Sequence, residues 1–118
     1  MSFSLNQLGN IDGYLGSCLV DSDSGMMLGS DAGGPVNLEL AAAGNTSVVR
    51  AKRKTMRSLK ITSKIEDILI SLNDQYHIIR PLEENEAIFL YLVLDRGKAN
   101  LAMARHELRN FEKGLNFK

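Results

Sequence analysis

The sequence has few of the residues that carry enzyme or metal chemistry. Its 118 residues include one cysteine, two histidines and no tryptophan. The lone Cys18 cannot form an internal disulfide, which favours a reducing compartment, so we expect a cytoplasmic protein. Neither His77 nor His106 has a second histidine at helical spacing, so the HExxH zinc motif is absent. Nothing marks a nucleophile on a strained turn, and we therefore expect no enzyme, no metal and no cofactor.

Two segments contain some residues of a ligand-binding loop but lack its spacing. The glycines between positions 29 and 34 are not followed by the GK[ST] of a phosphate-binding loop. The segment DSDSG over 21–25 begins like a calcium loop, but the sixth and twelfth positions would be Met26 and Ala32. We therefore interpret DSDSG as a turn between two strands.

The chain also lacks net charge and long apolar runs. Its 14 Lys and Arg balance 14 Asp and Glu, so no overall field attracts nucleic acid, and nucleic-acid binding is not expected. No apolar run approaches the roughly 20 residues that span a bilayer, so membrane insertion is not expected either. The length and the 44% hydrophobic content fit a single domain over 1–118 with one core.

Hydrophobic patterning predicts the element order αββαβββα. The apolar run over 87–94 is expected at the centre of a sheet that helices cover on both faces. Ser4 and Gln7 have the spacing of a capping box, and Asp95 is predicted to cap the last helix. The predicted fold is α+β, with a five-stranded antiparallel sheet between helices. The expected helices cover 4–8, 35–59 and 95–115, and the expected strands cover 13–20, 26–30, 65–72, 76–82 and 87–94.

The predicted helix over 35–59 divides into three faces at about 100° per residue. An apolar stripe suits packing on a sheet and contains Leu38, Ala41, Ala42, Val48, Val49, Met56 and Leu59. A second row, mostly of small residues, contains Leu40, Gly44, Ser47, Ala51, Thr55 and Ser58. A third row is entirely basic and contains Arg50, Arg53, Lys54 and Arg57.

The row of small residues predicts close contact with a second helix. Gly44 costs about 1 kcal/mol relative to alanine in a helix interior, which is easier to understand if another backbone approaches it. The edge strand over 65–72 could pair with its twin, and this would join two sheets into one continuous sheet. Small residues at exposed positions that contact nothing are the alternative. The predicted homodimer interface consists of Leu40, Gly44, Ser47, Ala51, Thr55, Ile68 and Ile70.

Two interpretations of the basic row have comparable weight. It is either a solvated helix face, which also suits the helix dipole, or the rim of an interface with an acidic protein. Nucleic acid is a weaker candidate, because Tyr14, Tyr76 and Tyr91 all fall in predicted strands and offer no stacking platform. We predict that Arg50, Arg53, Lys54 and Arg57 contact a protein partner.

Three segments resemble one known family. The first is GYLGSCLVDSDSGMMLGS over 13–30, which has a Gly-x-x-Gly-x-x-Leu-Val-Asp pattern. The second, LELAAAGN, begins the predicted long helix, and the third, FLYLVLDRGKANLAMARHEL, covers most of the predicted last strand and the start of the last helix. In these segments and in element order the chain resembles the roadblock/LC7 family of dynein light chains and their bacterial relatives. The predicted first helix is shorter than is usual in that family.

The resemblance implies a profilin/roadblock-like fold that dimerises across a two-fold axis. It also implies a non-catalytic regulator or scaffold that binds a small Ras-like GTPase on the face made by the paired long helices. The alternative is an architectural light-chain-type module that dimerises a larger complex without contacting a GTPase.

Overall fold

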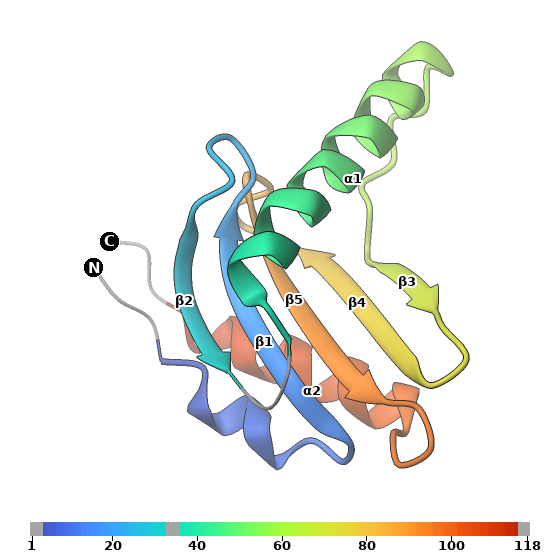
Figure 1. The fold of residues 1–118 in the computed structure, drawn as a ribbon. Helices are drawn as coiled ribbons and strands as arrows, with labels where there is room; N and C mark the ends of the chain where they lie inside the picture. The colour runs from blue at the N-terminus through green and yellow to red at the C-terminus, as the bar shows by residue number, and fades with distance from the viewer. Residues whose placement is uncertain (1–3, 33–35, 116–118) are drawn as a thin grey trace.

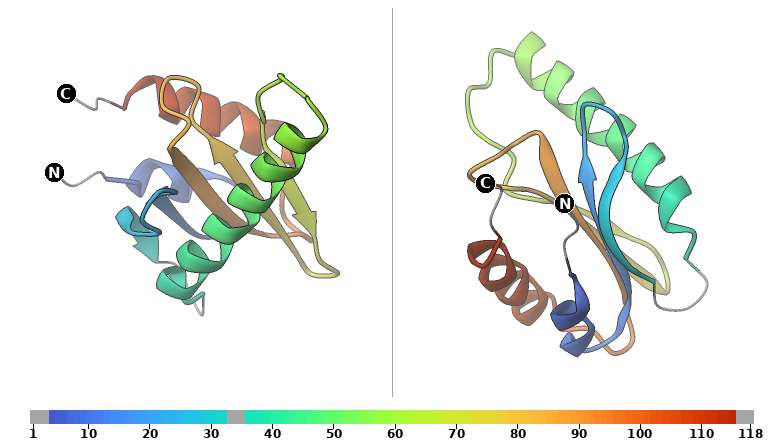
Figure 2. Two further views of the ribbon diagram at one scale, coloured as in Figure 1. Left: turned by 90° about the horizontal axis from the view of Figure 1, so that it is seen from above. Right: turned by 90° about the vertical axis from the view of Figure 1, so that its left-hand side faces the viewer.

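A computed structural model of the chain describes residues 4–32 and 36–115. All its strand pairs are antiparallel, in the order β2-β1-β5-β4-β3, with α1 on one face and η1 and α2 on the other (Figures 1 and 2). The predicted α+β class, element order and five-stranded sheet are confirmed. The elements are η1 Asn6–Asn10, β1 Tyr14–Asp21, β2 Met27–Ala32, α1 Leu38–Ser58, β3 Ile68–Ser71, β4 Gln75–Pro81, β5 Ile88–Asp95 and α2 Leu101–Lys113.

The central strand is β5, as the apolar run predicts. Its residues from Ile88 to Leu94 are buried, because helices cover both faces of the sheet. Alternate side chains enter two cores: Leu90, Leu92 and Leu94 lie on the α2 side, and Phe89, Tyr91 and Val93 lie on the α1 side. None of the helices among the described residues is long and apolar enough to cross a membrane.

A β-bulge in β1 places Tyr14 on the opposite face of the sheet from the one that alternation predicts. Strict alternation would place Tyr14 beside Cys18 and Val20 on the α1 side. The register with β5 shifts between Tyr14 and Gly16, so Tyr14 joins the α2-side core and Leu15 takes the α1 side. The Tyr14 hydroxyl then donates to the main-chain and side-chain oxygens of Asp31 in the neighbouring strand, both at 2.9 Å.

Helix α1 begins after Asn37, whose side-chain oxygen accepts a hydrogen bond from the Leu40 amide at 3.1 Å. The predicted start at Pro35 lies outside the described residues. The helix packs on β1 and β2, and its C-terminal end projects beyond the sheet (Figure 1). For that reason the predicted apolar stripe is only partly buried: Leu38, Ala42 and Val49 are in the core, whereas Val48 and Leu59 are 37% and 63% exposed.

Three predicted boundaries are wrong: tertiary contacts decide two of them, and a second local cap decides the other. The first helix is the 3-10 helix η1, which begins after Leu5 without a side-chain cap; burial of Leu5 and Leu8 under the sheet fixes it instead. Asn100 caps α2 through the Met103 amide at 3.2 Å. The Asp95 carboxylate closes the preceding turn instead, accepting from the Gly97 amide.

The third boundary is the start of β3, predicted at residue 65 and observed at Ile68. Ile68 pairs with Ile79, so continuing the ladder would place Glu66 opposite Pro81. Proline has no amide hydrogen to donate, and the pairing ends before it. Asp67 instead receives two hydrogen bonds from Arg105 of α2, at 2.9 and 3.2 Å.

Candidate partner-binding surface

The row of small residues on α1 points away from the chain's own sheet. Its predicted interface residues Leu40, Gly44, Ser47, Ala51 and Thr55 are all exposed, and Leu40 is 71% exposed. A Cβ built on Gly44 would meet no heavy atom within 4 Å. The fold within one copy therefore supplies no reason for a glycine there, and the predicted contact with a second helix stays a prediction.

The two predicted interface residues of β3 lie on the same side of the sheet as α1. Ile68 and Ile70 are half-buried against the α1-side core. β3 is an edge strand, hydrogen-bonded to β4 on one side. Because α1 packs over β1 and β2, at the opposite end of the sheet, the β3 end of this face lies beside the exposed side of α1 (Figure 1). The structure thus leaves the five α1 residues exposed and the two β3 residues half-buried on the α1 side of the sheet, and the predicted interface stays a prediction.

The basic row divides into two pairs. Arg50 donates from Nε to the Ser22 carbonyl at 2.8 Å and from Nη2 to the Asp23 carbonyl. Arg53 donates to the Glu86 carbonyl and, at 3.4 Å, to the Ser22 hydroxyl. These two arginines tie α1 to the β1–β2 turn and to the β4–β5 loop, a role that the sequence pattern did not indicate.

The other two basic residues, Lys54 and Arg57, are exposed on α1. Neither side chain makes a hydrogen bond or an ion pair with another residue in the described ranges. Arg50 is also exposed and uses two of its five N–H groups, so three donors remain. The cations available to a partner are therefore Lys54, Arg57 and part of Arg50, while Arg53 is half-buried.

The segment DSDSG is a turn, as interpreted. The Asp21 carboxylate accepts from the Asp23 amide at 2.9 Å and from the Ser24 hydroxyl at 3.3 Å, and Gly25 has φ +79°. Its oxygens are thus used within the turn. Among residues 4–32 and 36–115, no three His, Cys, Asp or Glu side chains gather closely enough to hold a metal ion.

Cys18 and His77 have structural surroundings. Cys18 is fully buried in β1, and burial raises the pKa of its thiol to about 12, so the reactive thiolate is disfavoured. His77 is half-buried; its Nδ1 lies 2.8 Å from the Tyr91 hydroxyl and its Nε2 lies 2.9 Å from Oε1 of Gln75. Burial lowers the pKa of His77, and the nearby Asp74 carboxylate opposes that shift. His106 is exposed on α2.

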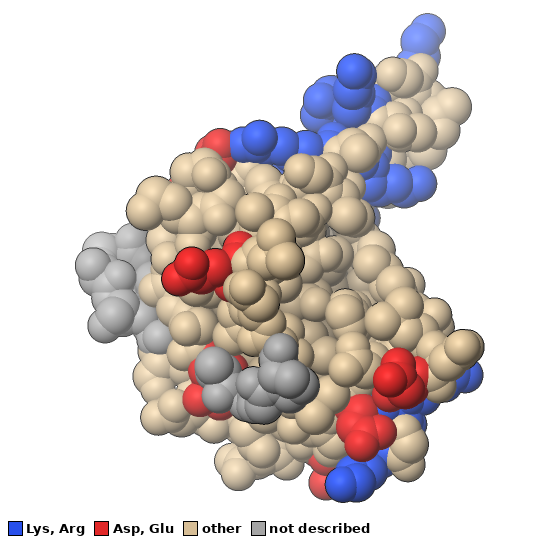
Figure 3. Space-filling model, viewed as in Figure 1, with Lys and Arg blue, Asp and Glu red and all other residues tan. Residues whose placement is uncertain are grey.

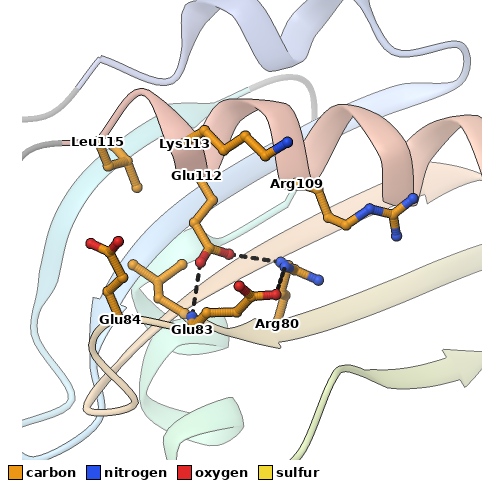
Figure 4. Close-up of a pocket in the computed structure, with 8 residues that line it drawn as sticks. Arg80, Glu83, Glu84, Arg109, Glu112, Lys113 and Leu115 are labelled. Atoms are coloured by element: carbon orange, nitrogen blue, oxygen red, sulfur yellow. Dashed lines mark hydrogen bonds and ion pairs between the residues drawn. The ribbon is translucent and has the colours of Figure 1, made fainter.

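The structure also shows an ion-pair cluster that sequence reasoning missed. Arg80 is only 4% exposed, and its Nε lies 2.9 Å from Oε1 of Glu112 on α2 (Figure 4). The other Glu112 oxygen accepts from the Glu83 amide at 2.8 Å. The one available signal was an arginine inside the apolar strand IIRPL, since a buried arginine needs a carboxylate partner. The adjacent cavity of about 120 Å³ is lined by Arg80, Leu82, Glu83, Glu84, Arg109, Glu112, Lys113 and Leu115.

No protein-family model matches the sequence, and neither does any curated protein. Solved structures match in shape. A roadblock/LC7 domain from Streptomyces avermitilis superposes with a TM-score of 0.78 at 12% identity, covering 92% of this chain and 87% of that one. The gliding protein MglB from Thermus thermophilus gives 0.76 at 17% identity, covering 92% and 80%. MglB in a tetrameric arrangement gives 0.78 at 18% identity, covering 94% and 81%.

The chain has the roadblock/LC7 fold. Its sheet carries the long helix α1 on one face and η1 and α2 on the other, as the element order predicted (Figure 2). The short first element is observed as well, since η1 has five residues. At 12% to 18% identity the similarity concerns the fold, so the partners of this chain have to be argued from its own surface.

Proposed function

We propose that this chain is a homodimeric, non-catalytic regulator or scaffold that binds a small Ras-like GTPase through its paired long helices. The observation that carries the proposal is the exposed row of small residues on α1, with no heavy atom of the described residues within 4 Å of a Cβ built on Gly44, together with the edge strand β3. The roadblock/LC7 fold supports it, because the family that the sequence resembles has this arrangement.

Self-association would pair the edge strand β3 and would also cover the small residues on the exposed side of α1. An open edge strand with half-buried isoleucines is a liability unless it is paired or covered. An isologous pair would match β3 with β3 and place the α1 helices against each other. Gly44 and Ala51 would then allow the two backbones to come close. The tetrameric arrangement of MglB shows self-assembly for that protein and agrees with this expectation.

The GTPase would meet the cations that the fold leaves available. Lys54 and Arg57 are exposed on α1, on the side where the basic row follows the small row around the helix. Exposed cations at a rim orient an acidic partner and speed its association. Any effect on GTP hydrolysis would arise because binding positions the switch residues of the GTPase, since no residue here is marked as a catalytic arginine.

The test is affinity capture with the purified chain from lysates loaded with a non-hydrolysable GTP analogue or with GDP. We expect a small GTPase to be captured in one nucleotide state only. Lys54→Glu with Arg57→Glu should abolish the capture while light scattering shows an unchanged dimer. Lys98→Glu with Arg109→Glu is the matched control, because these residues are exposed and lie away from α1. Unchanged capture by the α1 variant would refute the GTPase assignment.

The second candidate is an architectural module that dimerises a larger assembly and never contacts a GTPase. It is favoured by the finding that Arg50 and Arg53, half of the basic row, bind the chain's own turns. Capture of a long scaffold protein irrespective of the nucleotide would support this candidate over the first.

A further inference from the structure

The C-terminal end of α1 carries exposed apolar side chains. It projects beyond the strands (Figures 1 and 3). Leu59 and Ile61, within three residues of the helix end at Ser58, are 63% and 44% exposed. We call residues 52–64 the α1 tip. These two partly exposed side chains offer apolar surface, at a projecting end of the molecule, that the chain's own cores do not use.

The α1 tip carries charge of one sign. The chain has no acidic residue between positions 40 and 65. In Figure 3 the projecting end shows basic and neutral atoms and no acidic ones. The one ion pair of the tip found among the described residues joins Lys64 to Glu86 at 4.0 Å, with both side chains exposed. The exposed cations are Lys52, Lys54, Arg57, Lys60 and Lys64.

The backbone at the α1 tip is strained at a lysine. Helix α1 ends in a Schellman motif, in which the Ile61 amide donates to the Met56 carbonyl at 2.9 Å and the Lys60 amide to the Arg57 carbonyl at 3.1 Å. Lys60 therefore adopts φ +60°, a conformation that glycine usually supplies in this motif. It is the one non-glycine residue with positive φ in the described ranges. The residue at this position therefore adds a positive charge to the end of the helix at some cost in backbone strain.

We propose that the α1 tip docks on an anionic lipid surface. Leu59 and Ile61 would enter the boundary between headgroups and acyl chains, and the surrounding lysines would contact lipid phosphates. For the apolar pair Leu59 and Ile61 and the lysines next to it, a lipid surface explains the composition better than an acidic protein does. Protein interfaces are depleted in lysine and leucine is under-represented among their hot spots, whereas lysine clusters around exposed apolar residues are typical of peripheral membrane contacts. The contact is peripheral. The α1 tip shares Lys54 and Arg57 with the proposed GTPase surface, but the lipid contact is argued from Leu59, Lys60 and Ile61, which the GTPase proposal does not use.

Co-sedimentation with vesicles tests the proposal. The probes are vesicles of phosphatidylcholine alone and of phosphatidylcholine mixed with phosphatidylglycerol. We expect the full chain to bind only the mixed vesicles, and added salt to weaken the binding because it screens the lysines. Leu59→Ser with Ile61→Ser should weaken the binding at least about tenfold, since two apolar side chains are removed from the boundary.

The variant Lys60→Gly distinguishes a loss of vesicle binding from a loss of folding, because it should change the two in opposite directions. It removes one charge and relieves the left-handed strain, so binding should weaken by about fivefold while the melting temperature rises by a few degrees. Lys98→Gly, which removes one exposed charge in the β5–α2 turn, is the matched control and should leave vesicle binding unchanged. Because Lys54 and Arg57 are intact in all these variants, a negative result here leaves the GTPase proposal standing.

Three outcomes would overturn the proposal. The first is no binding, or equal binding to both kinds of vesicle. The second is a fall in molar mass for Leu59→Ser with Ile61→Ser, which would place the apolar pair between two copies. The third is capture of an acidic protein through the α1 tip without any vesicle binding.

Discussion

At the scale of single residues, Gly13 allows the start of β1 to pack closely against the backbone of the β5–α2 turn. It has φ +81°, and a Cβ at this position would lie 2.8 Å from the Asp95 carbonyl oxygen and 3.2 Å from the Ala99 nitrogen. Both neighbours are backbone atoms and cannot rotate away. The Gly13 carbonyl in turn accepts from the Asp95 amide at 2.7 Å. The first glycine of the Gly-x-x-Gly pattern is therefore explained by backbone packing.

Gly13→Ala should lower the free energy of unfolding by about 2 kcal/mol, because alanine is disfavoured at positive φ and clashes with the β5–α2 turn. Urea denaturation measures the change. Gly44→Ala is the matched control: Gly44 lies in a helix with open space around it, so alanine should stabilise a single copy by about 1 kcal/mol. Equal effects at both positions would contradict this account of Gly13.

His77 makes stability depend on pH in a defined direction. Burial lowers its pKa in the folded state below the ordinary value near 6.5, so the fold favours the neutral imidazole. The unfolded chain then binds a proton that the folded chain resists. His77 therefore contributes stability that is present above the unfolded pKa and is lost as the pH falls toward the lower, folded pKa.

Replacing His77 should flatten this dependence. His77→Gln should lose less stability than the native chain between about pH 7.5 and about pH 5.5, as measured by urea unfolding at both values. His106→Gln, at the exposed histidine on α2, is the control and should keep the native slope. A slope left intact by His77→Gln would show that another group carries the pH dependence.

At the scale of elements, one buried ion pair fastens α2 to the sheet. Arg80 and Glu112 are 4% and 12% exposed at their side chains, and the same carboxylate caps the Glu83 amide (Figure 4). Removing one partner of a buried pair leaves an uncompensated charge in the interior. The docking of α2 therefore depends on a polar contact as well as on its apolar face.

Glu112→Ala should destabilise the fold by about 3 kcal/mol, because Arg80 loses its closest carboxylate and Glu83 is 3.6 Å away and exposed. Thermal and urea unfolding measure the loss. Glu84→Ala removes an exposed carboxylate from the same cavity wall and should stay within about 0.5 kcal/mol of the native chain. A small effect at Glu112 would mean that Glu83 replaces it.

At the scale of the whole molecule, the proposed dimer depends on a lack of bulk along α1. We expect light scattering to give about twice 13.0 kDa for the native chain. Gly44→Arg should give a folded particle of 13.0 kDa, because a long side chain separates the two backbones and arginine is a better helix former than glycine.

Ala102→Arg is the control for added bulk and charge, since Ala102 is exposed on α2 on the opposite face of the sheet. It should leave the mass of the dimer unchanged. A native chain that scatters as a single copy at micromolar concentration would remove the dimer and the paired-helix surface together.

The sequence by itself determined the elements whose signals are local. The apolar run of β5, the turn chemistry of DSDSG and the periodicity of α1 lie within short segments, so the order αββαβββα and the antiparallel sheet follow from them. The exposure of the small row also follows, because helical spacing separates it from the buried stripe.

Only the tertiary structure decided contacts between residues far apart in the chain. Arg50 and Arg53 bind carbonyls 27 to 33 positions away, and Arg80 binds Glu112 at a separation of 32. The bulge that turns Tyr14 to the other core depends on the register with β5. Periodicity describes which face a side chain takes, but the partner on that face depends on which distant segments pack together, and no local pattern contains that information.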